Sequence, residues 1–327
     1  MLLTAALLLT VASAVACSAY FAPALAADGY PTKPVRLVVP YSPGGGSDVV
    51  ARIVGQKLTE AFGQTFVIDN RAGAAGMVGT DLVANAPADG YTLLLADAAY
   101  TINSSYYTKQ AHYDALKSFT PVALIADTPY LLMTNPGLPA ATLKEFIALA
   151  KAQPGKINVG SSGNGSGSHL VGELFKLKAG VNLNHIPYKG AGPSTADVMA
   201  GQIQATFAGA AGVVTFVKAG RLKALVAGSA KRSAILPDVP TFAELGFPDL
   251  VVTNWYGIVT PAGTPKNVVK RLYDEFTRAI AQPDVRERLT NVALEPVVPS
   301  PDLFGQLIAA EMKRWALVIK EANLKTE

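Results

Sequence analysis

Cysteine and histidine are scarce in this chain of 327 residues. Cys17 is the single cysteine and lies in an apolar N-terminal segment, and the three histidines are far apart in the sequence. His112, His169 and His185 do not have the spacing that zinc ligands usually show. If the N-terminal segment is removed, disulfides, thiol catalysis and cysteine-ligated zinc are all excluded. We therefore expect no metal and no cofactor.

Charged residues and catalytic motifs are also few. Asp, Glu, Lys and Arg make up 16% of the residues, and the formal net charge is +4. No basic cluster interleaved with aromatic residues is present, which argues against nucleic-acid binding. A nucleophile elbow of the form G-x-S-x-G is absent as well. Ser166 and His169 leave a serine hydrolase, or another enzyme acting on a small carboxylate or ester, as the alternative function, although no acid is placed to orient the histidine.

The N-terminal segment has the pattern of an export signal. An apolar run from Met1 ends in residues 24–26, a small-x-small triplet (Ala-Leu-Ala) of the kind that signal peptidase accepts. We expect residues 1–27 to be a signal peptide and the mature protein to be periplasmic. Lipid anchoring at Cys17 is less favoured, because Ala14 stands where such sites prefer leucine. No second hydrophobic span follows in the sequence.

The most informative motif is a glycine run between a predicted strand and a predicted helix. The apolar residues 35–39 are followed by three glycines at 44–46 and then by an amphipathic pattern. Glycines let main-chain N–H groups approach a ligand closely, and a helix start adds unpaired donors with partial positive charge. The motif therefore predicts an anion seat that needs no Lys or Arg. Ser47 and Asp48 stand where a P-loop requires Lys and Ser/Thr, which disfavours triphosphate binding. Val49 stands where the Rossmann motif G-x-G-x-x-G has its third glycine, which makes dinucleotide binding less favoured.

The same succession of strand, small-residue loop and helix recurs at residues 157–177 and 185–194. A plain connecting turn would explain one such loop, whereas the repetition favours a ligand site. The second loop is the serine- and glycine-rich stretch 161–168, and the third is 189–194. Open α/β sheets bind ligands beyond the carboxyl ends of their strands, so we expect these loops to converge around a small anionic molecule.

The order of strand and helix patterns predicts an α/β protein with two lobes. Two extended segments, at residues 121–134 and 251–259, leave the first lobe and return to it. We expect lobe 1 to comprise residues 28–128 and 256–327, and lobe 2 to comprise residues 129–255. The two crossing segments would join the lobes and allow them to hinge about a central cleft.

Six short motifs occur in a specific order along the mature chain. They lie at residues 43–48, 69–76, 89–94, 185–190, 220–225 and 255–265. Together they resemble the extracytoplasmic solute receptors of tripartite tricarboxylate transporters, the Bug or TctC family. The resemblance implies a periplasmic binding protein-like fold of type II that closes on a small carboxylate, with an aromatic or other dicarboxylate as a candidate. It also implies delivery to the membrane components of a tripartite transporter, and we expect the receptor to be a monomer.

The resemblance places one carboxylate of the ligand between loops of the two lobes, often through ordered water. The contacts expected from the first lobe are Tyr41, Gly44, Gly45, Ser47 and Asp48. Those expected from the second lobe are Ser161, Ser162, Gly163, Asn164, Gly165, Ser166 and His169. Tyr188 and Lys189 would line the wall of the cleft.

The chain departs from its relatives at positions that bear on the ligand. The loop after the third strand keeps Asn103 but lacks the histidine and proline that are common there, and Tyr100 occurs instead. Ala208 follows Phe207 where many relatives carry Asp, which predicts poor affinity for amino acids. Tyr100, Phe207 and Trp255 could present flat apolar surface to an aromatic carboxylate.

Overall fold

The computed structural model describes residues 29–321 and 323–324. The chain divides into a unit Met1–Tyr30 and a unit Pro31–Glu327, and the fold is that of the second unit. The expected signal peptide, with Cys17, lies outside the described residues. None of the helices in the described ranges is long and apolar enough to cross a bilayer.

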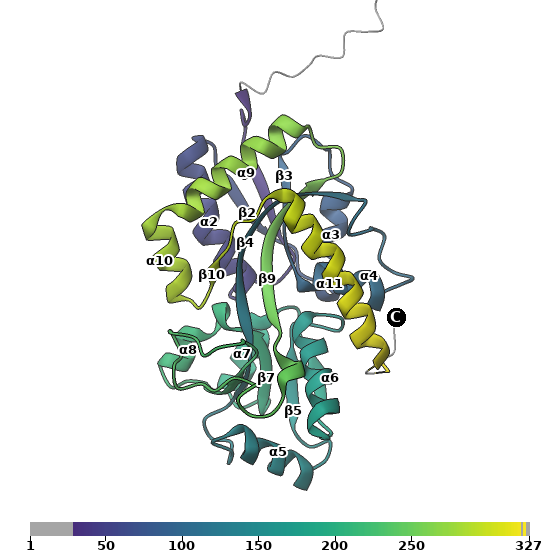
Figure 1. The fold of residues 1–327 in the computed structure, drawn as a ribbon, viewed down its shortest axis with the longest axis vertical. Helices are drawn as coiled ribbons and strands as arrows, with labels where there is room; N and C mark the ends of the chain where they lie inside the picture. The colour runs from purple at the N-terminus through teal and green to yellow at the C-terminus, as the bar shows by residue number, and fades with distance from the viewer. Residues whose placement is uncertain (1–28, 322, 325–327) are drawn as a thin grey trace, which may run out of the picture. The chain divides into compact units, whose positions relative to one another are not determined.

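The first lobe is built on a parallel sheet with strand order β2–β1–β3, flanked by helices (Figure 1). The sheet is stable because its apolar strands are covered by helices, each of which buries one apolar face against it. In α2 this face includes the fully buried Val50, Val54 and Leu58. Helix α2 is followed by its C-cap residue Gly63, whose φ of 65° is the left-handed conformation common at helix C-caps. The elements are β1 (Val35–Val39), α2 (Gly46–Phe62), β2 (Phe66–Asn70), η2 (Ala74–Gly76), α3 (Met77–Ala84), β3 (Thr92–Asp97) and α4 (Ala98–Tyr106).

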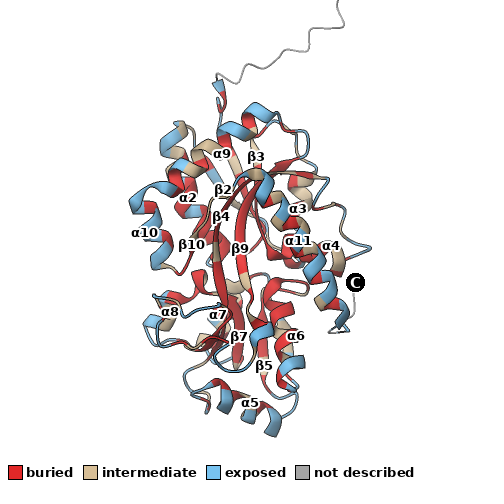
Figure 2. Ribbon diagram, in the orientation of Figure 1, coloured by how far each residue is buried: buried red, intermediate tan, exposed pale blue. Residues whose placement is uncertain are grey.

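Two long antiparallel strands, β4 (Phe119–Thr134) and β9 (Thr253–Pro261), connect the lobes. Their ladder runs from the pair Phe119–Pro261 to the pair Pro129–Thr253. Beyond Pro129, β4 pairs with β7 and β8 instead of β9. Strand β4 therefore belongs to the sheets of both lobes, and Figure 2 shows β4 and β9 buried along the middle of the molecule.

The second lobe continues the sheet in the order β4–β7–β5–β6, with β8 also paired to β4. Strands β5, β6 and β7 are mutually parallel, so helices must carry the chain back between them. Phe146 of α5 and Phe175 of α6 are fully buried against this sheet. The elements are α5 (Leu143–Ala152), β5 (Asn158–Ser161), α6 (Gly167–Ala179), β6 (Asn184–Pro187), α7 (Ala191–Met199), β7 (Ala205–Gly209), η3 (Ala210–Gly212), α8 (Val214–Lys218), β8 (Lys223–Ala227) and η4 (Pro248–Leu250).

The chain after β9 returns to the first lobe. Helix α9 packs against α2, and α11 packs along α4 and β4 (Figure 1). Trp315 of α11 is fully buried, and its indole N–H donates to Glu311 Oε2 over 2.8 Å, which satisfies the buried donor. The elements are α9 (Lys266–Ala281), α10 (Pro283–Asn291), β10 (Glu295–Pro296) and α11 (Pro301–Glu321).

The crossing strands depend on close packing between β9 and α11, which a pair of glycine substitutions can test. A Cβ added at Gly257 of β9 would collide with the ring of the buried Phe304. We expect Gly257→Ala to lower the free energy of unfolding by about 1–3 kcal/mol, as overpacked cores do. Gly305→Ala is the matched control, because its Cβ would meet Pro121 Cγ at an ordinary 3.7 Å.

The control should raise stability by about 0.5–1 kcal/mol, since alanine is the better helix former. Urea unfolding monitored by circular dichroism measures both changes. Equal stability of the two variants would contradict the packing described for β9 and α11.

Candidate functional site

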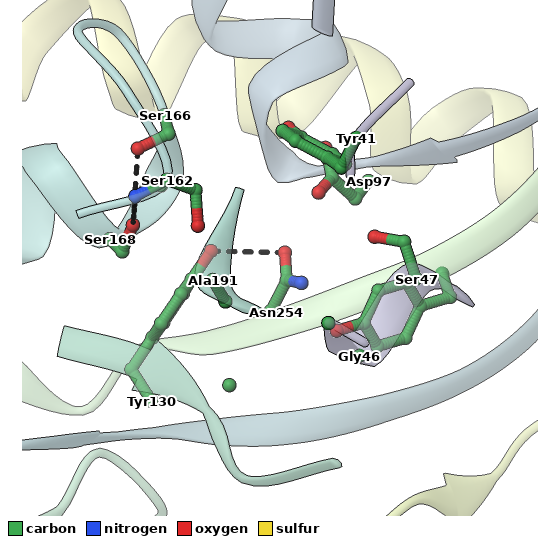
Figure 3. Close-up of a pocket in the computed structure, with 14 residues that line it drawn as sticks. Tyr41, Gly46, Ser47, Asp97, Tyr130, Ser162, Ser166, Ser168, Ala191 and Asn254 are labelled. Atoms are coloured by element: carbon green, nitrogen blue, oxygen red, sulfur yellow. Dashed lines mark hydrogen bonds between the residues drawn. The ribbon is translucent and has the colours of Figure 1, made fainter. Parts of the chain in front are cut away.

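A small polar cavity lies where loops of both lobes meet the crossing strands (Figure 3). Its volume is about 30 Å³, which is room for about two water molecules. The cavity is lined by Tyr41, Gly45, Gly46, Ser47, Asp97, Tyr130, Ser162, Ser166, Gly167, Ser168, Ala191, Gly209, Asn254 and Tyr256. No Lys, Arg or His is among these lining residues.

The first lobe contributes the N-terminus of α2 to the cavity. Gly45 is the N-cap residue of this helix and makes no side-chain capping bond, so the first N–H groups rely on other partners. Backbone packs very closely here. A Cβ at Gly46 would collide with the hydroxyl of Tyr256, and a Cβ at Gly192 would lie 2.6 Å from the carbonyl oxygen of Pro43. The glycines are therefore required by close approach as well as by any ligand.

The second lobe contributes the N-terminus of α6. Ser166 caps this helix, since its Oγ accepts from the backbone N–H of His169 over 3.2 Å. Ser168 Oγ accepts from the backbone N–H of Ser162 over 2.9 Å and also lies 3.1 Å from Ser166 Oγ. The positive ends of α2 and α6 thus line the same cavity from opposite lobes.

The crossing strands and the end of β3 supply the remaining polar groups. Tyr130 of β4 donates its hydroxyl to Asn254 Oδ1 of β9 over 3.0 Å, and the same oxygen accepts from the backbone N–H of Ala98 over 3.3 Å. Tyr41 donates its hydroxyl to Asp97 Oδ1 over 3.1 Å. Burial raises the pKa of Asp97 to about 6, because desolvation outweighs its hydrogen bonds.

The predicted site residues fall into several groups in the structure. Those that line the cavity are Tyr41, Gly45, Ser47, Ser162 and Ser166. Gly44 lies next to the cavity but is not in its lining, and its backbone N–H donates to Asp48 Oδ2 over 3.1 Å. Asp48 also forms an ion pair with Arg52 at 2.9 Å and accepts from Asn70 Nδ2 over 3.2 Å. These partners lower the pKa of Asp48 despite its burial, and they keep the carboxylate occupied within its own lobe.

A second group forms direct contacts between the lobes. The carbonyl oxygen of Lys189 accepts from Ser42 N over 3.1 Å and from Ser42 Oγ over 3.0 Å. The carbonyl oxygen of Asn164 accepts from the hydroxyl of Tyr107 over 2.7 Å. The backbone of Gly165 also lies very close to the first lobe, since a Cβ there would be 2.7 Å from the ring of Tyr107. The structure is therefore a conformation in which the two lobes touch.

Three more predicted residues lie near these contacts. Gly163 lies at ordinary contact distance from the first lobe, since a Cβ there would be 3.5 Å from Ala75 N. Asn103 is buried and donates from Nδ2 to the carbonyl oxygen of Ala75 over 3.1 Å. Tyr188 turns away from the cavity, because its hydroxyl donates to Asp197 Oδ2 over 2.6 Å on its own lobe.

A further group lies in the hydrophobic core. Tyr100, Phe207, Ala208 and Trp255 are all buried, and none of them lines the cavity. Tyr100 donates its hydroxyl to the carbonyl oxygen of Ala115, and its ring packs edge-on against Trp255 at a centroid distance of 6.5 Å. The flat surfaces considered for an aromatic ligand are therefore occupied by other core side chains. Ala208 is also outside the lining of this cavity.

His169, Ser161 and His185 support the second-lobe loop from behind. His169 Nδ1 accepts from the backbone N–H of Gly165 over 3.1 Å, which places the ring proton on Nε2. Ser161 Oγ lies 2.6 Å from His185 Nε2, and the two imidazole rings stack at 4.2 Å. Both rings are held behind the loop and not in the cavity lining.

His169 and His185, with Glu173, are the metal-capable group found among the described residues. Their ligand atoms lie within 4.8 Å of one another, although the histidines are far apart in sequence. The rings stack with only 20° between their planes, so their in-plane lone pairs do not converge on one point. Since Nδ1 of His169 accepts a hydrogen bond and its proton is on Nε2, the arrangement fits a hydrogen-bonded support better than a metal centre.

Several lining residues were missed by sequence reasoning, which concentrated on glycine-rich loops. Asp97, Tyr130, Asn254 and Tyr256 come from strands or strand ends, where side-chain direction depends on register. Two of them carried a usable signal. Asp97 is an acidic residue at the end of a buried apolar strand, and Asn254 interrupts an apolar run. Buried polar residues of this kind need partners, and a ligand site is one place that supplies them.

Comparison with known proteins identifies the family. A family model described as "Tripartite tricarboxylate transporter family receptor" matches residues 50–324. The chain belongs to this family. The protein BugT of Bordetella pertussis is 37% identical over 302 residues, which cover 92% of this chain and 93% of that relative.

Solved structures of similar proteins show the same fold, a two-lobed periplasmic binding protein of type II. The periplasmic binding protein BugD is 33% identical, with a TM-score of 0.89 over 91% of this chain and 100% of the other. The R. palustris protein Rpa4515, solved with adipate, is 34% identical, with a TM-score of 0.87 over 90% of this chain and 98% of the other. Members of the family are solute receptors and not enzymes, and this holds for the present chain.

The buried histidines predict how stability depends on pH. Burial lowers the pKa of His169 to about 4, and burial with repulsion from His169 lowers that of His185 to about 3. In the unfolded chain both titrate near their ordinary value of about 6.5. Between pH 6.5 and 4 the unfolded state therefore binds protons that the folded state does not, so these groups lower the free energy of unfolding as pH falls.

Asp97 has the opposite effect on the free energy of unfolding over the same pH range, because its raised pKa lets the folded state bind a proton at a higher pH than the unfolded state does. We expect His185→Gln to make the dependence of unfolding free energy on pH shallower between pH 6.5 and 4.5, measured by urea unfolding. His112→Gln, at an exposed side chain, is the matched control. An unchanged slope in His185→Gln would show that His185 is not buried in its neutral form.

Proposed function

We propose that this protein captures a small carboxylate between its two lobes and delivers it to the membrane components of a tripartite transporter. The observation that carries this proposal is that the N-termini of α2 and α6 line one cavity from opposite lobes, with no cationic side chain in the lining. Each terminus offers unpaired backbone donors and about half a positive charge, which together suit a carboxylate. A similar protein solved with adipate supports the same class of ligand.

Lobe closure is the proposed signal of binding. The cavity of about 30 Å³ is far smaller than the roughly 300–1,000 Å³ of typical small-molecule pockets, so a solute must enter while the lobes are apart. Contacts such as Tyr107 to Asn164 and Ser42 to Lys189 then favour the closed form. A ligand that touches both lobes adds its own contacts only in that form and shifts the population toward it.

We propose lobe boundaries at residues 28–128 and 256–327 for the first lobe and 129–255 for the second. The exchange of partners along β4 supports the first boundary, since Pro129 pairs with β9 and Tyr130 pairs with β7. The return lies within β9, whose residues from Thr253 onward pair with β4. We also propose export through a signal peptide at residues 1–27, a periplasmic location and a monomeric state.

The arrangement of serine and histidine does not suit a hydrolase. Ser166 Oγ accepts from the backbone N–H of His169 and lies beside Ser168 Oγ. The ring of His169 instead accepts from the backbone N–H of Gly165, and the Ser166 hydroxyl makes no hydrogen bond to that ring. Ser161 does contact the ring of His185, but it is only 1% exposed and is not in the cavity lining. Neither hydroxyl is thus an activated nucleophile facing a substrate.

A receptor for carboxylates should be stabilised by its ligand without changing it. We expect saturating ligand from a panel of small carboxylates, adipate included, to raise the melting temperature by mass action. Nuclear magnetic resonance spectra of the ligand should remain unchanged after prolonged incubation. Native mass spectrometry of freshly purified protein is a parallel measurement, since a retained ligand appears as added mass. If no carboxylate raises the melting temperature, or if the acid is consumed, the proposal is wrong.

The closure contacts can be tested with one hydroxyl. Tyr107→Phe removes the bond to the Asn164 carbonyl across the lobes and keeps the ring packed on Tyr106. A hydrogen bond contributes about 0.5–1.5 kcal/mol, so ligand affinity should fall about two- to tenfold. Small-angle scattering should show less compaction at a fixed, subsaturating ligand concentration.

Tyr91→Phe is the matched control, because its hydroxyl bonds Thr32 within the first lobe. Affinity and compaction should both stay at wild-type values in this variant. Equal affinities of Tyr107→Phe and Tyr91→Phe would show that the contact to Asn164 does not take part in closure.

A further inference from the structure

The cavity between the lobes contains one charged group that an anion seat does not call for. Asp97 is the one acidic or basic side chain among the 14 residues that line the cavity. It is only 8% exposed. Figure 3 shows it beside Tyr41, across the cavity from the serines of the second-lobe loop. A receptor that holds carboxylates thus has a carboxylate of its own in the binding cavity.

Asp97 has hydrogen-bond donors but no cation as a partner. Its Oδ1 accepts from the hydroxyl of Tyr41 over 3.1 Å and from the backbone N–H of Ala99 over 3.0 Å. Within residues 29–321 and 323–324, which the structure describes, no Lys, Arg or His forms an ion pair with it. Burying a carboxylate without a counter-charge is unfavourable, and its raised pKa of about 6 reflects this.

The charges of the cavity are therefore arranged in two parts. The N-termini of α2 and α6 favour a negative group, whereas Asp97 favours a positive or hydrogen-donating group. A plain dicarboxylate would bring a second negative charge near Asp97 with nothing to balance it. A ligand with both a carboxylate and a donor satisfies both parts.

We propose that Asp97 recognises a hydrogen-bond donor on the ligand, so that this receptor prefers carboxylates bearing an ammonium group, and next those bearing a hydroxyl group, over the plain acid of the same length. The inference rests on the proposed function and names the class of ligand that the same cavity takes. It reverses the expectation drawn from Ala208, which lies in the core and outside the cavity lining.

Asp97 also has a structural role, which a test must distinguish from its proposed role in ligand recognition. It is the N-cap residue of α4, where its side chain accepts from Ala99 N. Asparagine caps helices as well as aspartate does, so Asp97→Asn keeps the cap and removes the charge. The new amide can also donate to a second carboxylate of a ligand.

The experiment uses ligands that differ only at the second carbon. Isothermal titration compares succinate, malate and aspartate, then glutarate with glutamate, and adipate with 2-aminoadipate. In at least one length series, wild-type protein should bind the amino acid about tenfold or more tighter than the plain diacid, with malate intermediate if the four-carbon series is the one that fits. Asp97→Asn should remove or reverse this preference while its melting temperature stays near that of wild type.

Asp114→Asn is the matched control variant. Asp114 also accepts a backbone N–H, from Leu116 over 2.9 Å, but lies outside the cavity, so the ligand order should remain that of wild type. If Asp97→Asn does not fold, the wild-type ligand order and a second variant, Asp97→Ser, decide the question. Serine also caps helices, with a shorter side chain and without the charge, so Asp97→Ser should lose the preference for the amino acid.

The outcomes separate the two proposals. Binding of plain diacids as tightly as, or more tightly than, their amino and hydroxy counterparts in every series would overturn the role of Asp97 and leave the carboxylate receptor intact. An unchanged preference in folded Asp97→Asn would also overturn it. Absence of binding by every acid tested would instead overturn the proposed function itself.

Discussion

The arrangement of the molecule depends on the long antiparallel pairing of β4 with β9. β4 pairs first with β9 in the first lobe and then with β7 and β8 in the second, so a single strand carries hydrogen bonds into both sheets. A slip of one residue in the register of a strand moves every side chain to the opposite face. The pairing therefore sets which residues of the crossing strands face the cavity, and Tyr130, Asn254 and Tyr256 are positioned by it. In the proposed closure, the lobes hinge around this shared ladder.

The cavity between the lobes combines two electrostatic features that act in opposite directions. Helix N-termini supply positive potential from backbone alone, which explains how an anion can be held without Lys or Arg. Asp97 adds a buried negative charge on the same surface. A site of this kind is selective by balance of charge, because a ligand must satisfy both the donors and the acceptor before water is excluded. The family as a whole shares the fold, but this balance belongs to individual side chains.

Much of the support for the cavity lies one layer behind it. His169 and His185 hold the loop of the second lobe through Gly165 and Ser161, and Asp48 holds the loop of the first lobe through Gly44. These residues were predicted as ligand contacts or lie close to residues that were. The sequence shows that a polar group is near a loop, but it does not show on which side of the loop the group lies. Supporting groups of this kind fix the direction of backbone N–H groups, which is what a backbone anion seat requires.

The sequence by itself determined the α/β class, the two lobes and the three loops at strand ends. These follow from hydrophobic periodicity, glycine runs and helix-start signals, all of which act over a few residues. Residues 142–145 (Thr-Leu-Lys-Glu), for example, have the T-x-x-E sequence of a capping box, and in the structure Thr142 caps α5 with its Oγ accepting from Glu145 N.

Only the tertiary structure decided which side chains share the cavity. Tyr100 and Trp255 are taken into the core by packing, Asp97 and Asn254 are brought into the cavity by strand register, and His169 meets His185 across α6 and β6. The physical reason is that a helix terminus is a local property of the chain, whereas side-chain direction and lobe contact depend on residues far apart in sequence.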